Sequence, residues 1–144
     1  MIGITRAPRE GQAGQALLET ALVLPAMIAL LLGFLAVLIR VEAQLELDAA
    51  TSLAAAAAVS APTGDYALST RYAEATWAGT LRRYGYLSPG TLQGCAGYGT
   101  AGERVTCSST ATLRYSATPM ALVIPVDVTI SSRAEARSSE FRSR

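Results

Sequence analysis

Few side chains in this sequence have the chemistry of a catalytic or metal-binding site. The 144 residues include 11 acids, two cysteines and no histidine, so the usual general bases and zinc ligands are missing. The acids Asp65, Glu74, Glu103 and Asp127 are scattered, with no spacing that would pair two of them on one element. We therefore expect no enzymatic activity, no metal site and no cofactor.

The two cysteines, Cys95 and Cys107, bracket a glycine-rich stretch well beyond a long apolar span. An even number of cysteines in a small exported region favours a disulfide. Closing a loop of that length would stabilise the fold by on the order of 3 kcal/mol on the chain-entropy estimate. We expect Cys95 and Cys107 to be bonded to each other.

One acid, Glu19, stands at the start of the apolar span. Residues 20–39 carry no charge, and at about 1.5 Å per helical residue they cover the roughly 30 Å of a bilayer core. A carboxylate at the edge of hydrocarbon costs a few kcal/mol unless it finds a partner, which makes Glu19 a functional candidate. The plainer alternative is that Glu19 lies in a first helical turn near the headgroups, where the helix dipole favours negative charge.

The span could also be a secretory signal peptide that is removed. Val41, Glu42 and Ala43 form a passable cleavage site, after which the mature chain would begin at Gln44. However, the apolar core of such a peptide is usually about 7 to 15 residues long, which is shorter than this one. A small residue before the span, Gly14, would instead leave the helix on the mature protein.

The residues around Gly14 resemble the class III leader of type IV pilins. Residues 14–25 read GQALLETALVLP, similar to the opening GQALxExALxxP of the TadE-type pseudopilins of Tad (Flp) pili. The resemblance is dense over residues 14–58 and general beyond them. Thr20 departs from the aromatic residue that often follows the acid in that family, and Gln15 is not the aromatic usual at the start of mature type IVa pilins.

The resemblance implies a processing step and a role for the acid. A prepilin peptidase would cut between Gly14 and Gln15, so that residues 1–14 are the leader and Glu19 becomes the fifth mature residue. The Glu19 carboxylate would then pair with the freed amine of Gln15, on the same or a neighbouring subunit.

The function implied is that of a minor pseudopilin for a Tad/Flp-type pilus or a related secretion filament. Its partners would be other pilins and pseudopilins, the pilus assembly platform, the prepilin peptidase and membrane lipid. No nucleic acid is expected, since the formal net charge is only +1. The alternative is a single-pass, permanently anchored extracytoplasmic module for binding or adhesion.

The orientation in the membrane follows from the flanks of the span. Arg6 and Arg9 precede it and Arg40 follows it, a slight bias toward a cytoplasmic N-terminus. The two cysteines favour the same orientation, because disulfides form outside the cytoplasm. We expect a bacterial cytoplasmic membrane protein with residues 40–144 extracytoplasmic.

A single long helix should contain the span. Residues 15–39 form the transmembrane part and residues 40–61 an extracytoplasmic extension, which ends at a proline and glycine turn. Pro25 should kink or locally open this helix because it lacks a backbone donor. Ala29 and Gly33 form a small-residue pair that would allow another helix to approach closely.

Residues 62–137 should form a small α+β domain, followed by a solvated tail at 138–144. A second helix is expected over 66–86, where the aromatic residues favour core packing, with a membrane-interface or sugar-binding role as the alternative. Turns follow over 85–102. Strands are expected over 104–107, 111–115 and, most strongly, 120–130, with Pro125 indicating an edge strand or a bulge. The fold class is thus α+β and pilin-like, with a C-terminal antiparallel sheet.

Overall fold

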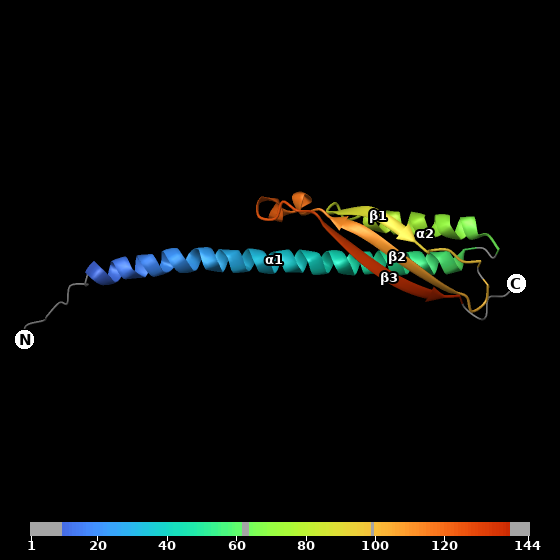
Figure 1. The fold of residues 1–144 in the computed structure, drawn as a ribbon, viewed down its shortest axis with the longest axis horizontal. Coiled ribbons are helices and arrows are strands. Elements are labelled where there is room, and N and C mark those ends of the chain that lie inside the picture. Colours follow the sequence, from blue (N-terminus) through green and yellow to red (C-terminus); the bar gives the residue numbers. More distant parts are fainter. Residues whose placement is uncertain (1–9, 62–63, 99, 139–144) are drawn as a thin grey trace, which may run out of the picture. The chain divides into compact units, whose positions relative to one another are not determined.

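The computed structural model describes residues 10–61, 64–98 and 100–138, with side chains from Leu17 onward. It shows an α+β chain of two long helices and one antiparallel sheet (Figure 1). The elements are α1 (Glu10–Ser60), α2 (Tyr66–Leu81), β1 (Leu87–Gln93), β2 (Arg104–Leu113), the 3-10 helices η1 (Tyr115–Ala117) and η2 (Pro119–Leu122), and β3 (Val128–Arg137). The chain divides into two compact units, Met1–Val37 and Leu38–Arg144.

Helix α1 confirms the expected long helix and its end. It continues through Pro25 and stops at Ser60, directly before the predicted turn. Gly64, in that turn, has a φ of +86°, a left-handed conformation that glycine adopts without steric cost.

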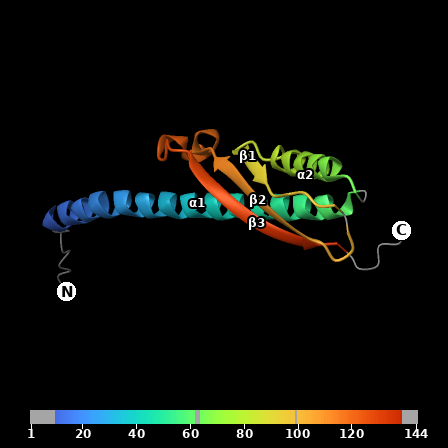
Figure 2. The same cartoon turned by 45° about the vertical axis from the view of Figure 1, so that its right-hand side comes forward.

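The sheet has the order β1-β2-β3, with β2 antiparallel to both neighbours. Its register places Leu113, at the end of β2, opposite Leu87 and Val128, and Arg104 opposite Arg137. A bulge interrupts the pairing of β1 between Pro89 and Leu92. Figures 1 and 2 both show β2 and β3 running beside the second half of α1, with α2 alongside.

The core lies between this sheet and one face of α1. Alternate residues of β2 are buried from Val105 to Leu113, as the two-residue period of a strand with one covered face requires. On α1 the buried face follows the helical period and consists of Ala43, Leu47, Ala50, Thr51, Ala54, Ala55 and Ala58. Because most of these side chains are single methyl groups, the sheet and α2 can approach the helix closely.

Several predicted boundaries were wrong. The second helix ends at Leu81 instead of residue 86. Residues 87–93, expected to be turns, form β1, and the two strands expected over 104–107 and 111–115 are one strand, β2. The strand expected over 120–130 is mostly η2 and irregular chain, and β3 begins only at Val128.

Candidate functional site

The first part of α1 is an apolar helix whose large apolar side chains are exposed. It is long and apolar enough to cross a membrane, and its most apolar 18-residue window has no share buried within the fold. Large apolar side chains such as Leu22 and Leu30 are each 75% exposed. Such exposure is unfavourable in water and favourable in hydrocarbon, so this segment is suited to lipid or to another apolar helix.

Glu19 lies at the start of this segment, on an exposed part of α1. With Thr20, Val23, Leu24 and Met27 it lines a shallow hollow of about 270 Å³ along the helix. Glu19, Val23 and Met27 are spaced four residues apart and therefore share one face. A side chain of a neighbouring helix could enter this hollow beside the carboxylate.

The expected cleavage point lies within helix α1. The helix begins at Glu10, so neither Gly14 nor Gln15 marks the start of an element. Their side chains, and residues 1–9 of the expected leader, lie outside the described part of the chain, as does most of the expected tail at 138–144.

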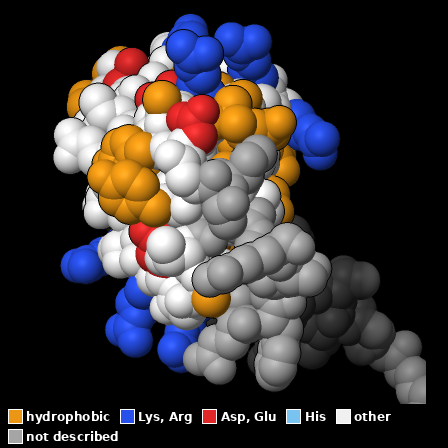
Figure 3. Space-filling view, turned by 90° about the vertical axis from the view of Figure 1, so that its right-hand side faces the viewer, with side chains coloured by type: hydrophobic (Ala, Val, Ile, Leu, Met, Phe, Trp, Pro, Cys, Tyr) orange, Lys and Arg blue, Asp and Glu red, His pale blue; other side chains and the backbone are white. Residues whose placement is uncertain are grey.

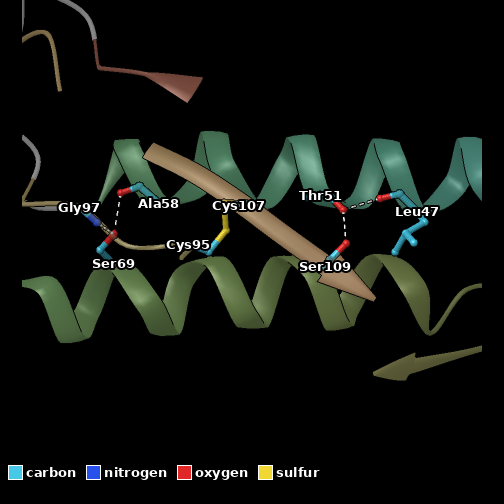
Figure 4. The surroundings of a disulfide bond; sticks show 8 residues. All are labelled: Leu47, Thr51, Ala58, Ser69, Cys95, Gly97, Cys107 and Ser109. Carbon is cyan, nitrogen blue, oxygen red and sulfur yellow. Dashed lines mark hydrogen bonds between the residues drawn. A yellow bond between two sulfur atoms is a disulfide. The ribbon is translucent and has the colours of Figure 1, made fainter. Parts of the chain in front are cut away.

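Cys95 and Cys107 form the expected disulfide, with their Cα atoms 4.5 Å apart. The bond joins the loop after β1 to the middle of β2, beside α1 and α2 (Figure 4). Gly94 precedes it with a φ of +70°, and a Cβ there would lie 2.7 Å from the Thr106 carbonyl oxygen. Glycine is therefore needed to bring Cys95 to Cys107.

Two buried hydroxyl groups connect the elements around this disulfide (Figure 4). The Ser69 Oγ donates to the Ala58 carbonyl oxygen at 2.9 Å and accepts from the Gly97 amide at 3.1 Å, so it joins α2, α1 and the disulfide loop. The Thr51 hydroxyl donates to the Leu47 carbonyl oxygen and lies 2.6 Å from the Ser109 hydroxyl of β2. These contacts fix how α1 and the sheet pack.

Two of the four scattered acids, Asp65 and Glu103, make contacts that shape the fold. Asp65 caps α2 by accepting from the Leu68 amide at 2.9 Å. Glu103 accepts from the Tyr98 and Thr100 amides and so shapes the loop between β1 and β2. In the described ranges, no three side chains of His, Cys, Asp or Glu lie close enough together to hold a metal ion.

Two tyrosines that follow α2 lie beside acids of α1. A hydrogen bond to Glu46 raises the pKa of Tyr84, and burial raises the pKa of Tyr86, to which the nearby Glu42 adds. Both phenols are therefore neutral at physiological pH. The sequence pattern predicts these tyrosines within the second helix, which ends at Leu81, and no local pattern indicates their approach to residues 42–46.

A polar groove of about 440 Å³ crosses the sheet, and it was not predicted from the sequence. Its lining comes from all three strands: Thr91, Gln93, Ser108, Ser109, Thr110, Ser131, Ser132 and Arg133. Among the lining residues, the Thr91 and Thr110 hydroxyls lie 3.0 Å apart, within hydrogen-bond distance. The alternation of small polar residues along 104–113 was the signal that could have indicated this surface. The groove offers hydrogen-bond donors and a guanidinium group, a chemistry suited to binding.

Comparisons with protein-family models, with curated proteins and with solved structures found no match to this chain.

Proposed function

We propose that this chain is a pseudopilin-like subunit that is held in the cytoplasmic membrane by α1 and contributes to a filament of the Tad type. The observation that carries the proposal is the division of α1 into two parts. Its first part exposes an apolar surface, and its second part belongs to the core of an α+β domain. A subunit built in this way can move between lipid and a bundle of sister helices while its outer domain stays folded.

Each candidate residue has a role in this proposal. Gly14 supplies the small residue that a peptidase at the membrane surface needs before the scissile bond, and Gln15 supplies the new amine. Glu19 pairs with that amine on a neighbouring subunit, which the shallow hollow beside it leaves room for. The disulfide keeps the outer domain folded outside the cytoplasm.

The test is the N-terminus of the mature protein in its native host. We expect it to begin at Gln15. Gly14→Val, whose branched side chain blocks access to the scissile bond, should leave a product heavier by the leader. Gly11→Val, a matched change three residues upstream, should be processed normally. A start at Met1 would favour a permanently anchored module, and a start at Gln44 would identify a removed signal peptide.

The polar groove favours a second candidate, the anchored binding module. Its hydroxyl groups and the exposed Arg133 would suit a polyhydroxylated ligand that carries an acid, such as an acidic sugar. In this case acidic glycans should bind the purified protein, Arg133→Ala should weaken binding, and Arg82→Ala, at an exposed position outside the groove, should not. Equal binding by both variants would exclude the groove as the site.

A further inference from the structure

An exposed apolar loop connects β2 to β3. Leu122, at the end of η2, is 97% exposed, and Val123 and Val126 are 49% and 61% exposed. The loop is nevertheless held in place, because the buried side chains of Tyr115 and Met120 anchor its base and the Thr118 hydroxyl accepts from the Met120 amide. An ordered loop that presents three large apolar side chains to solvent indicates a binding surface.

The second unit begins at Leu38, and the loop lies on the same side of the unit as this first residue. Gln44 of α1 donates to the Ser131 carbonyl oxygen of β3, whereas Thr51 lies farther along α1 and contacts Ser109. From Ser131 the strand runs back through Val128, a rise of up to about 10 Å, toward the first residues of the unit. Figures 1 and 2 agree in placing the orange η1–η2 loop at this end of the sheet.

The neighbours of the loop at this end are residues typical of a membrane interface. The link from α2 to β1 contributes Tyr84 and Tyr86, which lie near Glu46 and Glu42, and the Arg114 amide donates to the Tyr86 carbonyl oxygen. Exposed arginines at this end are Arg40, Arg82, Arg83 and Arg114, and the acids there are Glu42, Glu46 and Asp127. Tyrosine and arginine are the side chains that proteins place at the level of lipid headgroups.

The opposite end of the second unit differs in how its exposed apolar side chains are distributed. Figure 3 faces that end and shows apolar side chains in separate groups between polar and charged ones. The large apolar side chains exposed there include Tyr66 and Tyr98, whose rings pack on each other with centroids 5.4 Å apart. The three exposed aliphatic residues of this loop, Leu122, Val123 and Val126, therefore distinguish the end of the unit at Leu38.

We infer that the loop of Leu122, Val123 and Val126 inserts into the lipid bilayer, as a second membrane contact beside α1. This inference rests on the proposed function, in which α1 spans the membrane. Ile39 is the last residue of the uncharged span and Arg40 the first charge after it, so the membrane surface lies beside the end of the unit that carries the loop. At this position the loop contacts lipid. Insertion into the bilayer removes its apolar side chains from water.

The test uses tryptophan fluorescence of the full chain in phosphatidylcholine vesicles whose acyl chains carry bromine, a quencher. Trp77 is the single tryptophan, and its buried Nε1 has no hydrogen-bond partner, so Trp77→Phe provides a silent background. Leu122→Trp reports on the loop, Phe34→Trp on the span, and Ala101→Trp on the opposite end of the sheet. Since Leu122 and Ala101 are exposed, both positions can accept the larger side chain.

We expect the tryptophans at 122 and 34 to lose most of their emission in brominated vesicles and the one at 101 to lose almost none. Quenching at 34 without quenching at 122 would overturn the inference and leave the membrane span intact. No quenching at either position would overturn the span, and the inference with it. A blue shift at 122 without quenching would mean that protein covers the loop, which also contradicts insertion into lipid. Val126→Trp repeats the measurement if Leu122→Trp disturbs the fold, as judged by circular dichroism.

Discussion

Glu19 is the residue whose proposed role can be separated most cleanly from processing. We expect Glu19→Ala to leave cleavage after Gly14 intact and to remove most assembled filaments, because the carboxylate pairs with a neighbour's amine and does not present the scissile bond. The measurement is the N-terminal sequence together with filament counts in cells where the variant is the sole copy. Glu74→Ala removes an exposed acid from α2 and is the matched control. Normal filament numbers with Glu19→Ala would contradict the proposed pairing.

Tyr84 links stability to alkaline pH. Its pKa is raised above the usual value of 10.0, first by the hydrogen bond to Glu46. A folded-state pKa above the unfolded one means that this contribution is fully present below about pH 10 and is lost as the pH rises through the folded pKa. Tyr84→Phe should therefore lessen the fall in stability above pH 10.

The measurement for Tyr84 is thermal unfolding between pH 8 and pH 11, roughly the window that the tyrosine pKa sets. Tyr72→Phe, at an exposed tyrosine of α2, is the control and should leave the alkaline fall unchanged. Identical curves for Tyr84→Phe and the unmodified protein would show that the contact with Glu46 does not contribute.

At the scale of elements, the small pair of Ala29 and Gly33 can be tested without disturbing the fold. A Cβ built at Gly33 meets no atom within 4 Å, so Gly33→Leu should insert and fold normally. If sister helices pack on this face, the larger side chain should keep them apart and reduce assembly. Crosslinking in membranes measures this loss, with Ala21→Leu, on a different side of α1, as the control. Unchanged crosslinking would place the helix contact elsewhere.

The elements that were predicted correctly are those whose signal is local. The uncharged run before Arg40 and the absence of proline and glycine between Arg40 and Pro62 were enough to predict a long helix and its end. The disulfide was predictable because Cys95 and Cys107 are the only cysteines. The α+β class also followed from the pattern of residues.

The elements that were mispredicted depend on distant partners. Ser88, Pro89 and Gly90 have the composition of a turn, yet they form an edge strand because Thr110 lies against Gly90, where a Cβ would come within 2.8 Å of its carbonyl oxygen. In the same way, polar β3 pairs with β2 along its whole length. The branched residues before β3 contributed to the strongest strand prediction, but they belong to the exposed loop. The polar groove is lined by three strands, so the alternation within residues 104–113 could indicate only the part of its lining that β2 contributes.

At the scale of the whole molecule, the two compact units should be separable. Among the side chains that the structure describes, the buried apolar ones begin at Ala43 and belong to Leu38–Arg144, and the most apolar window of α1 has no share buried. We expect a fragment of residues 38–144, expressed in an oxidising compartment, to be soluble without detergent, folded, and bonded between Cys95 and Cys107. The full chain should require detergent or lipid.

Circular dichroism and mass spectrometry without reduction measure this outcome. Reduction of the fragment should lower its stability by on the order of 3 kcal/mol, the chain-entropy value for a loop of this size. A fragment that is unfolded or has free thiols would mean that the first unit is needed for the fold of the second.

The alanine-rich face of α1 has a consequence for the order in which the chain is made. A ribosome produces α1 first, and it produces β3, which packs against α1, only after the other strands and helices. Until β3 has been synthesised, the sheet does not cover the face of α1 from Ala43 to Ala58. This face presents mainly methyl groups, with Leu47 as its one large aliphatic side chain. A nascent chain of this kind exposes little apolar surface to which chaperones or other unfinished chains can bind. The small residues that let the sheet approach closely thus also protect the protein while its sheet is still being synthesised.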